Sequence, residues 1–188
     1  MTKNIMIVGV GGQGTLLASR ILGGVLLGEG FDVKVSEVHG MSQRGGSVVT
    51  YVRYGEKVHS PIIDKGEADV ILAFELLEAY RALPYLKKGG KILINRQRMN
   101  PMPVITGAME YPSDIEGKIK GVADATVIDA LALAREAGTI KAANVVLIGL
   151  MARSSEIPYE KWVETVKATV PPKFLEVNLR AFDAGYNS

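Results

Sequence analysis

A glycine-rich run between an apolar segment and a helix-like segment is the feature that most constrains this chain. Residues 5–8 form a short, continuous apolar run, and residues 9–14, which read Gly-Val-Gly-Gly-Gln-Gly, follow it directly. Residues 15–27 then place apolar side chains on one wide helical face. A strand, a G-x-G-x-x-G turn and a helix in this order indicate the opening unit of a Rossmann-like fold.

The rest of the chain continues to alternate strand-like and helix-like segments. We expect an α/β fold, a Rossmann-like doubly wound, mainly parallel sheet with helices on both faces and C-terminal helices. No repeat or linker divides the chain, so residues 1–188 are expected to form a single domain. Residues 96–111 hold two prolines and little periodicity, which indicates a loop with room for one edge strand. Strands are expected at 5–8, 31–38, 47–54, 68–74, 91–95 and 125–128, and helices at 15–27, 75–86, 129–137 and 142–151, with two more after Pro158 and after Pro171-Pro172.

Composition excludes several classes of site and partner. The chain has no cysteine, so it has no cysteine nucleophile, thiolate zinc site or Cys-ligated iron–sulfur cluster, and its two histidines are too few for a histidine-rich metal site. The net charge of +2 gives no basic field that would favour nucleic acid. The apolar stretches are shorter than the ~20 residues that span a bilayer. We therefore expect a cytoplasmic protein that binds neither nucleic acid nor a membrane.

The glycine loop is the first candidate site. Free N–H groups at the start of a helix, with the helix dipole behind them, favour an anion. Glu37 falls near the position of a ribose-binding acid, which keeps nicotinamide binding open as an alternative. The glycines alternatively serve only to let the helix and the strand pack closely. The candidate binding residues of this loop are Gly9, Gly11, Gly12, Gln13 and Gly14.

A second glycine-rich loop follows the second expected strand. Arg44 is a permanent, planar donor that suits carboxylate or phosphate, and the glycines beside it can expose backbone N–H groups to an anion. Because the carboxyl ends of parallel strands lie at the same edge of a sheet, we expect the two glycine loops to face one crevice. The alternative is a flexible turn with a solvated arginine. The candidate residues are Glu37, His39, Ser42, Gln43, Arg44, Gly45 and Gly46.

These two loops, together with residues 48–53, resemble the gamma-type domain of pyruvate and other 2-oxoacid:ferredoxin oxidoreductases. The run from Glu37 to Gly46, which reads Glu-Val-His-Gly-Met-Ser-Gln-Arg-Gly-Gly, and the C-terminal stretches 170–174 and 178–186 are similar to the small, or beta, subunits of the indolepyruvate branch. The glycine loop alone is a weak signal, whereas the second loop is a strong one. The resemblance covers essentially the whole chain.

The resemblance implies a role in the oxidative decarboxylation of aryl pyruvates to aryl-acetyl-CoA, with ferredoxin as electron acceptor. It implies that this chain is an oxidoreductase subunit, inactive without its large alpha subunit. Thiamine diphosphate and iron–sulfur clusters would belong to that large subunit, which would also be the link to ferredoxin. The small subunit would have no catalytic residue or tightly bound cofactor of its own. It would offer Ser42, Gln43 and Arg44 to CoA phosphates or to the substrate carboxylate.

Three other interpretations remain open. The chain could be the gamma subunit of another 2-oxoacid:ferredoxin oxidoreductase, a stand-alone NAD(P)-binding Rossmann oxidoreductase, or a non-catalytic module that stabilises its partner. Apolar surface meant for a partner would make a homodimer plausible for the isolated chain. Met99 and Met102 suit an adaptable contact surface, and the helix at 142–151 suits either the core or a partner. Tyr159 and Trp162 suit the core or an interface.

Overall fold

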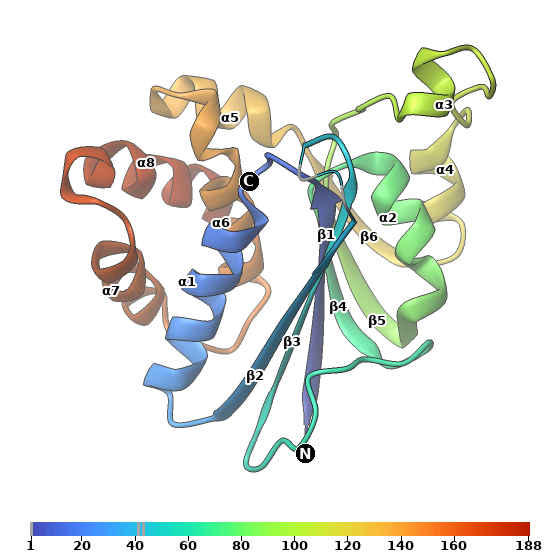
Figure 1. Ribbon diagram of the computed structural model, residues 1–188. Helices are drawn as coiled ribbons and strands as arrows, with labels where there is room; N and C mark the ends of the chain where they lie inside the picture. Colours follow the sequence, from blue (N-terminus) through green and yellow to red (C-terminus); the bar gives the residue numbers. More distant parts are fainter. Residues whose placement is uncertain (1, 41, 43) are drawn as a thin grey trace.

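A six-stranded sheet forms the centre of the molecule (Figure 1). The computed structural model describes residues 2–40, 42 and 44–188. In the sheet the strands follow the order β2-β3-β1-β4-β5-β6. The strands are β1 (Lys3–Val10), β2 (Asp32–His39), β3 (Ser47–Gly55), β4 (Ala68–Ala73), β5 (Leu86–Asn95) and β6 (Asp124–Ile128).

Most of the sheet is parallel, as expected, but β3 runs against its neighbours. The pairs β1–β4, β4–β5 and β5–β6 are parallel, whereas β3 pairs antiparallel with both β1 and β2. The short connection between β2 and β3, residues 40–46, is the physical reason. A parallel crossover needs about a dozen residues or more, so a connection of this length makes a hairpin. As a result β2 runs in the same direction as β1, with β3 between them.

Helices cover both faces of the sheet, and the prediction of a doubly wound fold with C-terminal helices is confirmed (Figure 1). One face carries α1, α5, α6, α7 and α8, and the other carries α2 and α4. The short α3 projects beyond the sheet on the same side as α4. The helices are α1 (Thr15–Gly28), α2 (Leu76–Ala82), α3 (Met102–Ile105), α4 (Ile115–Lys120), α5 (Ala130–Ala137), α6 (Ala143–Arg153), α7 (Tyr159–Thr169) and α8 (Leu175–Tyr186).

The central strand β1 is apolar from residue 5 to residue 8 because it has a core on each side. Ile5 and Ile7 belong to the larger core beneath α1, α6 and α8. Met6 and Val8 point the other way and belong to the smaller core beneath α2 and α4. Successive side chains of a strand alternate between the two faces of the sheet. A continuous apolar run is therefore what a strand buried on both faces requires.

Helix α6, predicted as a buried helix at 142–151, is covered by α8 of the same chain. The two helices cross at Gly149 and Gly185. A Cβ on Gly149 would overlap the carbonyl oxygen of Phe182, and one on Gly185 would overlap the carbonyl oxygen of Val146. Trp162 is also fully buried. The alternatives left open for α6 and Trp162 are thus resolved in favour of the core.

The segment between β5 and β6 differs from expectation. The prediction of an edge strand within 96–111 is wrong, because this segment holds the short helix α3 and no strand. Helix α4 was not anticipated. Strand β5 also begins at Leu86 and so includes Gly89 and Gly90, which had been expected to precede it. Both short helices contain few residues, so periodicity in the sequence gives little signal for them.

Candidate functional site

The two glycine loops meet at the carboxyl edge of the sheet, as the strand pattern predicted. The amide of Gly11 donates a 2.8 Å hydrogen bond to the carbonyl oxygen of Gly46, and the amide of Gly45 donates a 3.2 Å bond to the carbonyl oxygen of Gly11. Val10 at the end of β1 pairs with Ser47 at the start of β3. The loops therefore form one connected rim.

Two glycines of the first loop, Gly9 and Gly14, stand where a larger side chain would clash with its neighbours. A Cβ on Gly9 would stand 2.9 Å from the Cβ of Phe74, and one on Gly14 would stand 2.5 Å from Nδ2 of Asn144. Gly14 has a positive φ of 82°, and its carbonyl oxygen accepts a 3.2 Å hydrogen bond from Asn144 Nδ2. Gly12 differs, because its φ is 103° and nothing lies within 4 Å of the Cβ position. Gly12 therefore faces open space.

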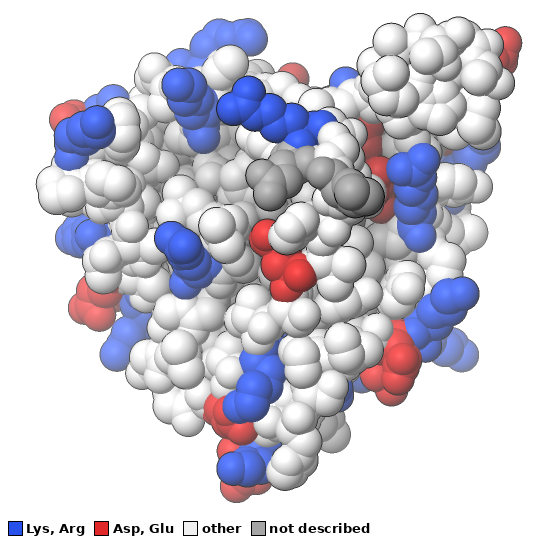
Figure 2. All heavy atoms as spheres, viewed as in Figure 1, with Lys and Arg blue, Asp and Glu red and all other residues white. Residues whose placement is uncertain are grey.

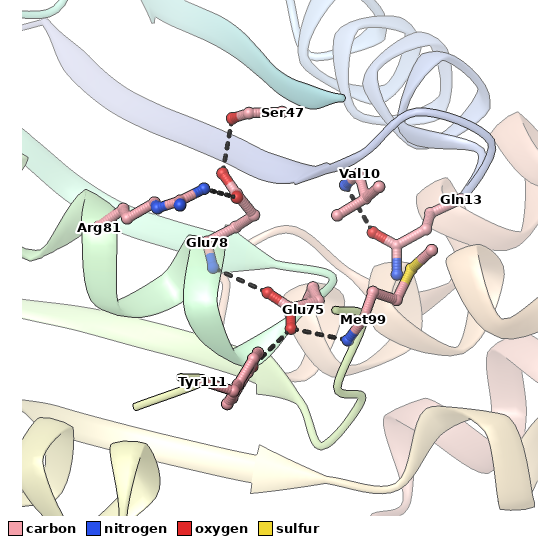
Figure 3. Close-up of polar contacts among 8 residues, drawn as sticks. All are labelled: Val10, Gln13, Ser47, Glu75, Glu78, Arg81, Met99 and Tyr111. Atoms are coloured by element: carbon pink, nitrogen blue, oxygen red, sulfur yellow. Dashed lines mark hydrogen bonds and ion pairs between the residues drawn. The ribbon is translucent and has the colours of Figure 1, made fainter. Parts of the chain in front are cut away.

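The side chain of Gln13 forms hydrogen bonds within the chain, near the ends of the strands (Figure 3). Its Oε1 accepts a 2.7 Å hydrogen bond from the amide of Val10. Its Nε2 donates to the carbonyl oxygen of Phe74 at 3.0 Å and to Oε1 of Gln97 at 2.8 Å. The side chain thereby links the segments that follow β1, β4 and β5, and its amide donors already have partners within the chain.

The second loop holds Arg44 at the surface. Ser42 Oγ donates a 2.6 Å hydrogen bond to the carbonyl oxygen of Arg44. A Cβ on Gly46 would stand 2.5 Å from the carbonyl oxygen of Ser42, and Gly45 has a positive φ of 77°. Both glycines are thus required by the turn. Gln43, the other donor expected here, lies outside the described residues.

Glu37 and His39 lie on the edge strand β2, both exposed. Glu37 Oε2 accepts a 3.3 Å hydrogen bond from Thr50 Oγ1, and His39 Nδ1 lies 3.8 Å from Glu37 Oε1. Neither residue is among those that line the pocket at this edge. The structure therefore places Glu37 and His39 within β2, outside the lining of the pocket that Arg44 contributes to.

A pocket of about 400 Å³ opens beside the second loop. One wall is the loop itself, with Ser42, Arg44, Gly45 and Gly46. The opposite walls are helix α2, with Glu78 and Arg81, and the segment 99–102 with Ile105. Of the first loop and the strand before it, Val10 lines the pocket and the glycines do not.

Two charged residues in this pocket, Glu78 and Arg81, escaped the sequence analysis. Glu78 is 5% exposed, and its carboxylate accepts a 2.6 Å hydrogen bond from Ser47 Oγ and a 2.7 Å charged bond from Arg81 Nη1 (Figure 3). The charge of Arg81 compensates the charge of the Glu78 carboxylate, which could not be buried without such a partner. Arg44 forms no ion pair within the described part of the chain, so its charge remains available to a ligand.

Glu75 fixes the wall of the pocket formed by the segment after β5. The residue is 1% exposed, and its carboxylate accepts hydrogen bonds from the amide of Glu78 at 2.9 Å, the amide of Met99 at 3.0 Å and the hydroxyl of Tyr111 at 2.7 Å (Figure 3). Burial raises the pKa of Tyr111 far above its ordinary value, and the bond to Glu75 adds to the rise. Arg98 lies 4.2 Å from the centre of the Tyr111 ring. Both ends of the segment 99–111 are therefore tied to α2.

One signal in the sequence could have pointed to this cluster. Glu75 directly follows the apolar run of β4, at the carboxyl end of a central parallel strand, and Glu78 stands three residues later. A buried charge at this position would destabilise the fold unless hydrogen-bond or ion-pair partners surround it. Arg81, one helical turn after Glu78, supplies one such partner.

Among the described residues, the side chains form neither an iron–sulfur site nor a cluster of metal ligands. The chain lacks cysteine, and within residues 2–40, 42 and 44–188 no group of three or more His, Asp or Glu side chains could hold a metal ion. Among the helices of those residues, none has the length and apolar character to cross a membrane.

A family model described as pyruvate ferredoxin/flavodoxin oxidoreductase matches residues 4–188. The chain belongs to this family. Its relatives include proteins named indolepyruvate oxidoreductase subunit IorB. The one from Thermococcus kodakarensis is 45% identical, with 97% of this chain and 93% of the relative covered, and the one from Archaeoglobus fulgidus is 37% identical, with 100% and 95% covered. The recognition of the family from the two loops is confirmed.

A more distant relative carries the matching region as part of a longer protein. The ketoisovalerate oxidoreductase subunit VorA of Methanothermobacter thermautotrophicus is 30% identical over 96% of this chain, and the match covers 35% of VorA. Among solved structures, the pyruvate oxidoreductase subunit PORC of Thermotoga maritima superposes with a TM-score of 0.76 at 20% identity, with 100% of this chain and 96% of that chain covered. This last similarity supports the fold.

Proposed function

We propose that the chain is the small subunit of a cytoplasmic indolepyruvate ferredoxin oxidoreductase. The complex would convert aryl pyruvates and CoA to aryl-acetyl-CoA and carbon dioxide, with reduction of ferredoxin. The observation that carries this proposal is the 45% identity, over nearly the full length of both chains, to a protein named as an indolepyruvate oxidoreductase subunit. The second loop, which carries the strongest part of the resemblance, forms one wall of the Arg44 pocket.

The proposal assigns the redox cofactors to the large alpha subunit. Thiamine diphosphate would supply a carbanion sink and iron–sulfur clusters would carry electrons. A cluster needs thiolates, and the chain has no cysteine. The contribution of the small subunit is then the binding and orientation of a reactant at the boundary with its partner.

Arg44 is the residue that we assign to the reactant. It lies on an exposed turn, its charge has no ion-pair partner among the described residues, and it lines a pocket of about 400 Å³. An arginine in such a place binds a carboxylate or phosphate with charge-assisted hydrogen bonds. The anion is a phosphate of CoA or the carboxylate of the 2-oxoacid, since both reactants carry one. Ser42 keeps the turn in shape through its bond to the backbone of Arg44.

An apolar tip, residues 99–109, is the surface that we assign to the large subunit. None of these residues is charged, and Met102, Ile105 and Met109 are 66%, 64% and 64% exposed. Figure 2 shows the projecting region around α3 as a knob almost free of charge, whereas charges are spread over the rest of this face. Exposed apolar patches of this kind mark protein interfaces. The base of the tip forms one wall of the Arg44 pocket, so docking here would bring the pocket to the partner.

The test is reconstitution with the large subunit. Indolepyruvate- and CoA-dependent reduction of ferredoxin is measured with the large subunit alone, with the small subunit added, and with Arg44→Ala added. We expect activity to require the small subunit, and Arg44→Ala to raise the apparent KM for CoA or for the 2-oxoacid. Arg135→Ala, an exposed arginine in the last turn of α5, is the control. If the two subunits fail to associate, the proposal is wrong.

A second candidate is the gamma subunit of an oxidoreductase for another 2-oxoacid. A 2-oxoglutarate synthase subunit KorC of Methanothermobacter marburgensis is 28% identical over 98% of this chain. A similar chain therefore occurs in a protein named for a different 2-oxoacid. Comparison of indolepyruvate, phenylpyruvate, pyruvate and 2-oxoglutarate as substrates of the reconstituted complex distinguishes the candidates. Preference for an aliphatic acid would favour this second one.

A further inference from the structure

A second pocket lies at the opposite edge of the sheet, where the parallel strands begin. Its volume is about 650 Å³. It is lined by the first residues of β1, β4 and β5, by the end of β3, and by the chain that leaves α1 and α6. No residue is shared between its lining and the lining of the Arg44 pocket. The proposed function makes no use of it.

Apolar and aromatic side chains form one part of the lining of this pocket. Ile5 and Met151, at 2% and 4% exposure, form part of its floor. Phe31 and Tyr54 stand together on its wall with ring centres 5.1 Å apart and ring planes at 66°. Phe31 is 37% exposed, so part of its ring is free to meet a ligand. An edge-to-face pair with an open ring is a favourable surface for a third aromatic ring.

The lining of the pocket holds four lysines and three acidic residues. Lys3, Lys88 and Lys91 line it and form no ion pair with any described residue. Two lining carboxylates are already paired, Asp69 with Lys87 at 3.0 Å and Glu29 with Lys161 at 3.7 Å. Glu156 is the remaining acidic group in the lining. The free charges around the pocket are thus mainly cationic.

A bulge in β5 brings the lysines to this place. In the pairing with β4, Ala68 faces Leu86 and Val70 faces Lys91, so residues 87–90 stand opposite the single residue Asp69. Gly89 has a positive φ of 78°, and a Cβ on Gly90 would lie 3.0 Å from the carbonyl oxygen of Ala68. Both glycines are therefore needed for the bulge. Bulges redirect side chains, and this one carries Lys87 and Lys88 to the pocket.

The hydroxyl of Tyr54 adds a neutral donor. Burial raises the pKa of Tyr54 above its ordinary value, and the charges of Asp69 and Glu156 raise it further. The hydroxyl consequently keeps its proton and can donate a hydrogen bond to an acceptor between the lysines and the aromatic wall.

We propose that this pocket binds a small aromatic carboxylate. Its ring would lie against Phe31 and Tyr54, and its carboxylate would lie at the rim with Lys88 and Lys91. The volume is in the range of small-molecule sites, which combine an apolar interior with a few placed polar groups. This site is separate from the crevice at Arg44, so the inference does not depend on the proposed function.

The test is calorimetric titration of the full chain with indole-3-acetate. We expect saturable binding that is much tighter than the binding of indole, which lacks the carboxylate, or of acetate, which lacks the ring. Lys88→Gln and Phe31→Ala should each weaken it by about tenfold, the loss expected from one charged hydrogen bond or one aromatic contact. Lys141→Gln, an exposed lysine elsewhere, should bind normally, and so should Arg44→Ala.

Phe31→Leu replaces Phe31→Ala if the alanine variant does not fold, since leucine keeps the apolar bulk and lacks the ring. The absence of saturable binding would overturn the inference. So would equal binding of acetate or inorganic phosphate, which would mean that the lysines attract any anion. Loss of binding in Arg44→Ala with retention in Lys88→Gln would assign the ligand to the other pocket and would also overturn it.

Discussion

The amide of Gly11 and the carbonyl oxygen of Gly46 are joined by a 2.8 Å hydrogen bond, and the amide of Gly45 returns a bond to Gly11. This link makes a single unit of two loops that are far apart in the sequence. The turn that holds Arg44 is thereby attached to the end of β1, the central strand of the fold. A rigid support of this kind is what a binding residue on a loop requires.

The first prediction concerns Gly46→Ala. The new Cβ would stand 2.5 Å from the carbonyl oxygen of Ser42, a backbone atom, so the turn must open. We expect a loss of about 1–3 kcal/mol in the free energy of unfolding, as for other overpacked sites. We also expect a higher apparent KM for the anion bound by Arg44. Gly40→Ala is the control, because nothing lies within 4 Å of its Cβ position. Equal behaviour of the two variants would argue against a fixed turn.

The second prediction concerns Glu75 and Tyr111. Glu75→Ala leaves one buried and two partly buried donors without their acceptor, so it should cost about 2 kcal/mol or more, at roughly 1–3 kcal/mol for a buried unsatisfied group. Tyr111→Phe removes one of these donors and should cost about 1 kcal/mol. Urea denaturation of both single variants and of the double variant measures their coupling. If the two effects simply add, the carboxylate and the hydroxyl do not act together.

The third prediction concerns stability in alkaline solution. The hydrogen bond to Asp183 at 2.5 Å, with burial, raises the pKa of Tyr159 to about 12. The unfolded chain loses this proton near pH 10, its ordinary value, while the folded chain keeps it. Stability from this group is therefore complete below pH 10 and is lost as the pH rises toward 12. Tyr159→Phe should make the fall in thermal midpoint over this interval shallower, and an unchanged slope would contradict the assignment.

The fourth prediction concerns the apolar tip. Met102→Asp and Ile105→Asp place a charge on the surface that we assign to the large subunit, and each should weaken assembly by about tenfold or more. Neither should lower the thermal midpoint of the isolated chain, since both side chains are exposed. Val122→Asp, at a residue that is 76% exposed, is the matched control. Sedimentation of the mixed subunits is the measurement, and normal assembly of both tip variants would exclude this surface.

Sequence reasoning was strongest where structure depends on neighbours along the chain. The end of β1, the start of α1 and the buried helix α6 each have a local cause, in an apolar run, a glycine turn or an apolar segment of helical length. Even the meeting of the two loops followed from strand direction alone. The antiparallel insertion of β3 was missed, although the short connection before it limits the chain to a hairpin.

Only one wall of the Arg44 pocket could be predicted from the sequence. Arg44 and its glycines stood out because several donors and small residues occur together. Glu78, Arg81 and the segment 99–105 reach the pocket from elements that lie far from the loop in sequence, so tertiary packing alone brings them there. The same holds for Gln13, which as a loop donor suggested ligand binding, and whose hydrogen bonds in fact run to Val10, Phe74 and Gln97.

The most direct test of the whole account is the activity of Arg44→Ala in the complex with the large subunit. Assembly is measured first, so that binding of the partner and binding of the reactant are separated. The account predicts normal assembly, normal activity of Arg135→Ala, and an apparent KM for CoA or aryl pyruvate raised by about tenfold in Arg44→Ala. An assembled Arg44→Ala complex with unchanged KM for both reactants would contradict it.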